Sequence, residues 1–155
     1  MKKQRIYVDT SVIGGCFDLE FKTWSNGLMK DFRLGHFIPV ISEVVKAEIL
    51  PAPEPVRKKY EELMELEPEI LLVNEEVQNL TSRYKALKIL TVKFENDLTH
   101  IALATVAGVD ILTSWNFKHI VHFDKIRQFN GVNLEQGYNP IQIHSPREVT
   151  HYEDD

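Results

Sequence analysis

Short segments rich in Val and Ile alternate with amphipathic helical segments along most of this chain, and this alternation limits the folds it can adopt. The sequence predicts strands at Arg5–Val8, Phe37–Ile41, Ile70–Val73, Val109–Thr113 and Ile141–Ile143. Strands that alternate with helices favour a mostly parallel sheet covered by helices on both faces. We therefore expect an α/β protein, a three-layer α/β/α sandwich with a mostly parallel central sheet.

The segments between these strands carry helix signals. Helical periodicity, proline positions and end signals predict helices at Trp24–Leu34, Glu43–Leu50, Val56–Leu66, Glu75–Leu87, Leu98–Ala107 and His119–Phe129. Gly35 and Gly108 stand where helix C-caps are expected, and Gly14-Gly15 is expected to break regular structure after the first strand.

Length and composition indicate one ordinary globular domain. The chain has 155 residues, of which 43% are hydrophobic and 26% charged. We expect a single domain over residues 1–150 and a frayed tail at 151–155. The single cysteine, Cys16, excludes an internal disulfide and a multi-cysteine zinc site. No apolar run approaches the ~20 residues of a membrane span, and no signal-peptide core is seen, so we expect a cytoplasmic protein that does not bind membranes.

The net charge of −5 counts against a binder that coats nucleic acid with basic side chains. It does not exclude an enzyme acting on nucleic acid, because a site built from carboxylates is itself acidic and metal ions can invert the local field. The placement of the acidic residues is therefore more informative than their number.

Three polar residues lie near predicted strand ends or at a buried helix start, where ligands bind in open α/β sheets. Asp9 follows the first strand, Asp97 opens the most apolar helix, and Asn116 comes a few residues after the fourth strand. Each also has a structural interpretation, because Asp and Asn commonly cap helices and form turns. Taken singly, none of them establishes a site.

Glu48 is unusual in another way. It shares the apolar stripe of its helix with Val44, Val45 and Ile49. A carboxylate on a core-facing stripe costs free energy unless a cation or hydrogen-bond donors satisfy it. The alternatives are an edge position or a salt bridge to a Lys or Arg.

Asp9, Glu48, Asp97 and Asn116 can converge at one edge of such a sheet. Clustered carboxylates raise one another's pKa, and a divalent cation relieves that repulsion. Ligands that offer only oxygen select Mg²⁺ or Mn²⁺ over zinc. These ions activate water and stabilise the charge that develops on a phosphodiester, so hydrolysis of phosphodiester bonds fits best.

The sequence resembles the PIN-domain ribonucleases found as VapC-type toxins of toxin–antitoxin pairs. The matching motifs appear in the family's order and are Ile6–Ser11, Ser42–Ile49, Asn96–Ala104 and Ile111–Asn116. The resemblance implies a PIN-like fold, Mg²⁺- or Mn²⁺-dependent cleavage of an RNA substrate, homodimerisation and an antitoxin protein as inhibitor. By motif match, Asp9, Glu48 and Asp97 are the metal-binding, catalytic acids. Asn116 is the nearest match to the fourth catalytic and metal-binding residue and would offer its amide oxygen.

One departure from the family pattern opens an alternative. Many members carry an Asp where this chain has Asn116, and an amide oxygen brings no charge. A second metal would be held less tightly, so a weakly active or inactive PIN scaffold that binds a protein or RNA partner is the competing hypothesis. A phosphatase with an aspartyl nucleophile is disfavoured, because that chemistry needs an acid two residues after Asp9 and the chain has Ser11.

Two histidines lie near the predicted site. His100 follows Asp97 by one helical turn and could hydrogen-bond near the acids, although a structural role is the simpler interpretation. His119 belongs to a basic stretch that could contact RNA phosphates or assist proton transfer, or could form a solvated helix face.

Overall fold

A computed structural model describes residues 2–151 and confirms the α/β architecture. Its five strands are β1 (Arg5–Val8), β2 (Ile38–Ser42), β3 (Glu69–Leu71), β4 (Ile111–Thr113) and β5 (Gln142–His144). Every strand pair is parallel, and the strand order is β3-β2-β1-β4-β5. The chain thus builds outward from β1 in one direction, then returns to pair β4 with the other side of β1.

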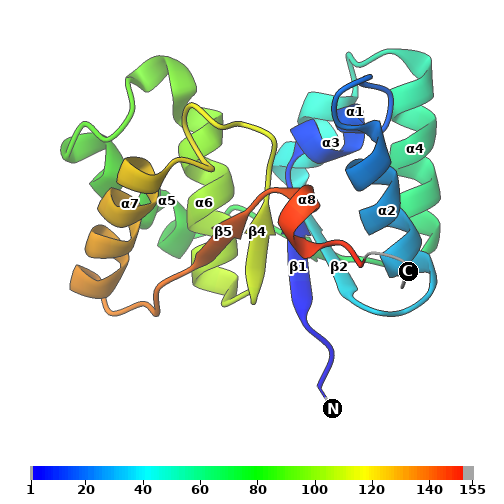
Figure 1. Cartoon of the computed structure of the whole chain (residues 1–155). Coiled ribbons are helices and arrows are strands. Elements are labelled where there is room, and N and C mark those ends of the chain that lie inside the picture. The colour runs from blue at the N-terminus through cyan, green and yellow to red at the C-terminus, as the bar shows by residue number, and fades with distance from the viewer. Residues whose placement is uncertain (1, 152–155) are drawn as a thin grey trace.

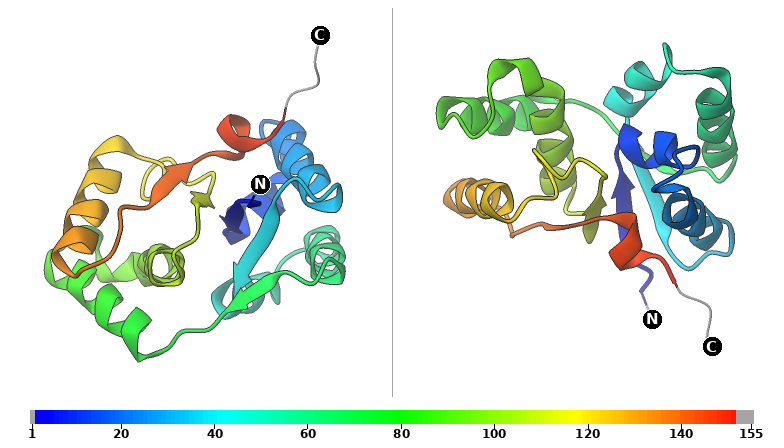
Figure 2. Two further views of the ribbon diagram at one scale, coloured as in Figure 1. Left: turned by 90° about the horizontal axis from the view of Figure 1, so that it is seen from below. Right: turned by 45° about the horizontal axis from the view of Figure 1, so that its top comes forward.

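The helices form the two outer layers of the sandwich. They are α1 (Thr10–Gly15), α2 (Lys22–Arg33), α3 (Glu43–Ile49), α4 (Glu54–Glu65), α5 (Glu75–Ala86), α6 (Glu95–Ala107), α7 (Phe123–Glu135) and α8 (Pro146–Val149), with a 3₁₀ turn, η1, at Val92–Phe94. Helices α1 to α4 lie on one side of the sheet and α5 to α7 on the other (Figures 1 and 2). This division follows from right-handed crossovers that reverse direction at β1. None of the helices in residues 2–151 has the length and apolar character needed to cross a membrane.

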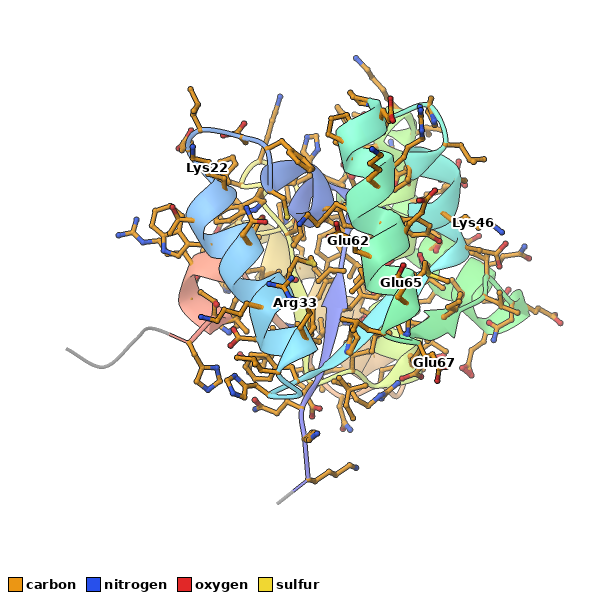
Figure 3. The ribbon with its side chains drawn as sticks, turned by 90° about the vertical axis from the view of Figure 1, so that its right-hand side faces the viewer. Lys22, Arg33, Lys46, Glu62, Glu65 and Glu67 are labelled. Carbon is orange, nitrogen blue, oxygen red and sulfur yellow. The ribbon has the colours of Figure 1, made fainter. Side chains whose placement is uncertain are left out.

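The core lies on both faces of the sheet. Strands β1, β2 and β4 are almost fully buried, and helix α6 is buried along most of its length. The outer faces are charged: Figure 3 shows Arg33 of α2 and Glu62 and Glu65 of α4 on the outside of one helical layer. A sheet buried on both faces leaves its strand ends as the natural place for a ligand.

Two predictions are wrong. Helix α7 runs from Phe123 to Glu135 rather than from His119 to Phe129. It begins later than predicted because the Asn116 side chain and carbonyl form a turn with the N–H groups of His119 and Ile120. Gly15 does not interrupt regular structure but is the last residue of helix α1. A Cβ atom at this position would lie only 2.7 Å from the Trp115 ring nitrogen. That glycine permits close packing rather than a turn.

The remaining predicted elements are present with ends shifted by a few residues. Helix α6 ends at Gly108 as expected, in the left-handed conformation. Of the predicted tail, His151 donates its backbone N–H to Asp31, and residues 152–155 lie outside the described part of the chain.

Candidate metal centre

Asp9 lies at the end of β1, where the order of the strands in the sheet reverses. It directly follows β1, and Ser114 directly follows the neighbouring strand β4. One Asp9 carboxylate oxygen, Oδ1, accepts hydrogen bonds from Ser11 Oγ at 2.6 Å and from the Val12 N–H at 3.2 Å. The other, Oδ2, accepts from Ser114 Oγ at 2.5 Å. Asp9 is therefore the N-cap of α1 and also a fixed carboxylate at the sheet edge.

Burial makes the Asp9 carboxylate costly to ionise. The residue is only 4% exposed, and this desolvation raises its pKa above the usual value, although the nearby His100 and the hydrogen bonds from Ser11, Ser114 and Val12 act in the opposite direction. Three donors are thus insufficient to offset the burial. A bound cation would supply the missing stabilisation of the charged form.

Glu48 reaches the same edge from helix α3. Its Oε1 accepts hydrogen bonds from Thr10 Oγ1 at 2.8 Å and from His100 Nε2 at 2.7 Å. Burial is the largest single influence on its pKa and raises it, but the His100 contact and the Thr10 hydrogen bond prevail and lower the pKa below its usual value. The Glu48 side chain is therefore held ionised and pointed toward the residues that follow β1.

A buried chain of hydrogen bonds supports Glu48 from behind. The His100 side chain is only 3% exposed, and its Nδ1 lies 2.6 Å from the Tyr7 hydroxyl, which lies 2.8 Å from Ser42 Oγ. Tyr7 is in β1 and Ser42 is the N-cap of α3, so this series of hydrogen bonds connects the sheet to the helix that carries Glu48. His100 thus has both roles considered from the sequence, as a structural histidine and as a partner of an acid.

Asp97 stands in the first turn of α6, where the helix dipole favours an acid. Its Oδ2 lies 3.1 Å from His119 Nδ1 and accepts a hydrogen bond from Asn116 Nδ2 at 3.3 Å. His119 is buried and its ring packs against Phe94 with 3.9 Å between ring centroids, so it does not form part of a solvated helix face.

Both the nitrogen and the oxygen of the Asn116 side-chain amide form hydrogen bonds within the protein. The Nδ2 group donates to Asp97, while Oδ1 accepts from the backbone N–H of His119 at 3.0 Å. Its own backbone N–H donates to Ser114 Oγ at 2.9 Å, the same hydroxyl that donates to Asp9. Asn116 therefore bridges Asp97 to the Asp9 side of the site. In this arrangement its carbonyl oxygen serves as a turn acceptor, the structural role considered from the sequence.

Asp9, Asn116 and Asp97 are thus linked by hydrogen bonds through Ser114 at the carboxyl edge of the sheet. Glu48 belongs to a separate set of hydrogen bonds and approaches this edge through Thr10, the residue after Asp9. The carboxylates of Asp9, Glu48 and Asp97 nevertheless do not all lie within 4.8 Å of one another. Mg²⁺ normally keeps several of its waters and uses only one or two carboxylates directly. The all-oxygen acidic groups fit such an ion, with part of the contact made through water.

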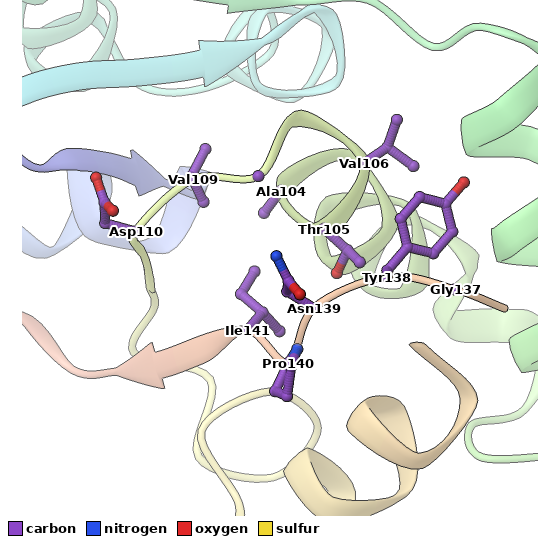
Figure 4. Close-up of a pocket in the computed structure, with 11 residues that line it drawn as sticks. Ala104, Thr105, Val106, Val109, Asp110, Gly137, Tyr138, Asn139, Pro140 and Ile141 are labelled. Carbon is purple, nitrogen blue, oxygen red and sulfur yellow. The ribbon is translucent and has the colours of Figure 1, made fainter. Parts of the chain in front are cut away.

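An open depression adjoins the acids. It has a volume of about 480 Å³ and is lined by Glu48, Asn96, Asp97 and residues 92–95, which include Lys93 and Phe94. A second cavity, of about 430 Å³, lies at the opposite edge of the sheet between the end of α6 and the segment before β5, and Figure 4 shows Thr105, Asp110 and Tyr138 among its lining residues. None of the four expected site residues lines the second cavity.

The sequence did not indicate which residues hold the Asp9 carboxylate in place. Ser11 and Ser114, which stand just after β1 and β4, each donate a hydrogen bond to it. Their short distance from strand ends was the available signal. The contact between His119 and Asp97 joins residues 22 positions apart and left no local pattern in the sequence.

Comparison with known proteins supports the fold. No protein-family model and no curated protein matches the chain. Among solved structures, a chain of VapBC2 from Rickettsia felis bound to a promoter DNA fragment is 14% identical, with 92% of this chain and 98% of that chain covered and a TM-score of 0.59. A chain of FitAcB from Neisseria gonorrhoeae is 14% identical, with 93% and 99% covered and a TM-score of 0.59.

A third structure, VapBC-1 from nontypeable Haemophilus influenzae, matches at 16% identity, with 93% of this chain and 99% of that chain covered and a TM-score of 0.56. Identities this low establish shared architecture only. The protein therefore has the PIN-like α/β/α fold found in these VapBC and FitAB complexes, and its resemblance to VapC-type proteins is confirmed at the level of the fold.

Proposed function

We propose that this protein is a Mg²⁺- or Mn²⁺-dependent endoribonuclease that acts in the cytoplasm as the toxin of a type II toxin–antitoxin pair. The observation that carries the proposal is the buried Asp9 carboxylate, which is linked to Asp97 through Ser114 and Asn116. Glu48 bonds to Thr10, the residue next to Asp9. A carboxylate whose pKa is raised by burial, as that of Asp9 is, is typical of functional sites. The fold shared with chains of toxin–antitoxin complexes supports the biological role.

Within this proposal the protein's own groups keep the acids in place. Ser11 and Ser114 orient Asp9, Thr10 and His100 orient Glu48, and His119 and Asn116 orient Asp97, in each case by hydrogen bonds. Asp9, Glu48 and Asp97 would hold the cation. When bound, such an ion activates water and offsets the negative charge that develops on a phosphodiester.

The depression beside Glu48 and Asp97 is where we place the RNA substrate. Lys93 lines it and is suited to contact a phosphate, and Phe94 offers an aromatic surface packed on His119. A single basic side chain beside an acidic site agrees with the net charge of −5, because affinity would come largely from the metal and the reacting phosphate.

The test is cleavage of a labelled RNA by the purified full chain. We expect cleavage with Mg²⁺ or Mn²⁺, none after chelation with EDTA, and a loss of at least about 100-fold in Asp9→Asn and Asp97→Asn, as for removal of a group central to charge stabilisation. Asp124→Asn is the matched control, because Asp124 is exposed and lies at the start of α7. Full activity in both site variants would refute the proposed function.

We further propose an antitoxin protein and a second copy of the chain as partners. The solved structures that share the fold are named VapBC2, FitAcB and VapBC-1, and the first of them is bound to a promoter DNA fragment. Several large apolar side chains of this protein are exposed, among them Leu19, Val92 and Phe123. Light scattering of the purified chain tests the dimer, for which the expected result is twice the mass of one chain.

The second candidate function is a PIN scaffold without catalysis, which binds a protein or RNA partner. It is favoured by the two hydrogen bonds that occupy the Asn116 amide within the protein. Calorimetry with Mn²⁺ separates the two functions. The catalytic proposal requires binding that Asp97→Asn weakens, whereas the scaffold predicts no binding at these acids and no cleavage of RNA.

A further inference from the structure

A second group of metal-ligating side chains lies at the other end of the molecule from the acids. Asp31 is in the last turns of α2, His36 is in the loop before β2, and His151 follows α8. Their ligand atoms all lie within 4.8 Å of one another, and within residues 2–151 no other set of three His, Cys, Asp or Glu side chains meets this criterion. Local structure explains how they come together.

The end of α2 places His36 over Asp31. Gly35 has a φ of +77°, which an L side chain rarely adopts, and its N–H bonds to the Phe32 carbonyl at 3.1 Å. The His36 N–H then bonds to the Asp31 carbonyl at 2.9 Å, which completes a Schellman motif. The turn brings His36 Nδ1 to 2.9 Å from Asp31 Oδ1.

The C-terminal part of the described chain supplies the third group. Thr150 Oγ1 and the His151 N–H donate to Asp31 Oδ2 at 2.7 and 3.1 Å, and His151 Nδ1 lies 3.2 Å from Asp31 Oδ1. The His36 and His151 rings lie 4.6 Å apart between centroids. Both imidazoles therefore meet the same carboxylate oxygen, from segments more than 100 residues apart in sequence.

The burial of these three side chains and the distances between their ligand atoms suit a metal ion. The Asp31 side chain is only 5% exposed and firmly held, while the side chains of His36 and His151 are 42% and 57% exposed, so solvent can reach the nitrogen side. Ligands bound tetrahedrally at about 2.0–2.1 Å from a zinc ion are separated by roughly 3.3 Å. The two Asp31–imidazole distances, 2.9 and 3.2 Å, already approach that separation.

We propose that Asp31, His36 and His151 form a second metal site, selective for Zn²⁺ and similar borderline transition-metal ions, with water as the fourth ligand. Two imidazole nitrogens and one carboxylate match the preferences of zinc and disfavour Mg²⁺, which prefers oxygen ligands. The site would join the segment after α8 to the end of α2 and act as a structural clip. It is chemically distinct from the all-oxygen centre at the carboxyl edge of the sheet.

Proton accounting is simple. In the metal-free protein each Nδ1 donates to the Asp31 carboxylate, whereas an ion needs the Nδ1 lone pair. When the ion binds through Nδ1, each neutral imidazole therefore carries its proton on Nε2. An imidazolium would have to release one proton, so binding should weaken in acid.

The experiment is calorimetric titration of the tag-free full chain with Zn²⁺, in buffer with excess Mg²⁺ to occupy the carboxylate centre. We expect one Zn²⁺ per chain and a rise in the unfolding temperature on addition of Zn²⁺. His36→Gln and His151→Gln should each weaken binding by at least about tenfold, since even residues that only orient a ligand change metal affinity by about 10–100-fold. Asp97→Asn should bind Zn²⁺ as the unmodified chain does.

His144→Gln is the matched control, because His144 is also a solvent-accessible histidine that contacts a carboxylate, Glu148. Its Zn²⁺ affinity should be unchanged. Metal-free unfolding curves establish that each variant is folded. The proposal is overturned if the unmodified chain binds no Zn²⁺ under these conditions, or if both His36→Gln and His151→Gln bind it as tightly as His144→Gln does.

Discussion

Replacing Asp9 by Asn should stabilise the metal-free protein while removing its activity. Asp9 is buried at the end of β1, and an asparagine of the same shape fills the position without the charge. The Ser11 and Val12 hydrogen bonds to Oδ1 can be kept, and the new amide can donate to Ser114 Oγ. The variant therefore removes a buried charge with little change in packing.

The magnitude follows from two opposing contributions. Burying an ion costs several kcal/mol even after relaxation, and hydrogen bonds to a charged acceptor return about 1.5–3 kcal/mol each. The raised pKa of Asp9 shows that the cost of burial prevails. We expect Asp9→Asn to gain about 1–3 kcal/mol at neutral pH, which for a domain of this size corresponds to roughly 2–4 °C in Tm per kcal/mol.

The direction of the Asp9 pKa shift determines how the stability gained in Asp9→Asn varies with pH. Because the folded-state pKa of Asp9 lies above its unfolded value of 3.8, the folded protein binds the extra proton and loses stability as the pH rises through that interval. The advantage of Asp9→Asn should therefore be largest at neutral pH and shrink in acid, where both side chains are uncharged. Thermal unfolding in EDTA from acid to neutral pH measures this.

Added Mn²⁺ should reverse the order of stability, because it binds the unmodified folded protein and not the variant. The exposed control Asp124→Asn should stay within about 0.5 kcal/mol of the unmodified chain throughout. The reasoning fails if Asp9→Asn is less stable than the unmodified protein in EDTA at neutral pH.

Three further variants test other parts of the structure. Glu48→Gln should lower the free energy of unfolding at neutral pH, because the pKa of Glu48 is lowered in the folded state. The difference in free energy of unfolding from the unmodified chain should vanish as the pH falls below the usual pKa of 4.5, which urea unfolding measures. Asn116→Asp should bind Mn²⁺ about tenfold more tightly in calorimetry and be less stable in EDTA, because its charge faces Asp97; unchanged affinity would place position 116 outside the centre. Leu112→Ala should lose about 2–5 kcal/mol in denaturant unfolding, because Leu112 is fully buried in β4, and a loss below 1 kcal/mol would contradict that burial.

The fold was largely predictable because its signals are local. Hydrophobic runs and helix periodicity depend on neighbours in sequence, so all five strands were predicted, each within a few residues of its observed bounds. The errors arose where side chains far apart in sequence, or a side chain acting as a turn former, decided the local structure. His119 was assigned to a helix because the turn made by Asn116 resembles a helix start in sequence.

The candidate site was predictable only in part. Asp9 was identified by its place at a strand end, where ligands bind in such sheets, and Glu48 by its unusual place on an apolar stripe. The structure places both at one edge of the sheet. Their partners His100 and Ser114 come from other elements, and only the packing of α6 and β4 brings them close. The cluster of Asp31 with two histidines was not foreseen, because its members are joined by a turn and by the C-terminal segment.

The central claim is that Asp9, Glu48 and Asp97 gather one hard cation. Crystals of the full chain soaked in Mn²⁺ test it directly through the anomalous signal of the ion. The account predicts a peak at the carboxyl edge of β1, with Asp9 or Asp97 oxygens at about 2.0–2.5 Å and the remaining acids bound directly or through water. A well-ordered crystal with no peak among these three side chains would contradict the account.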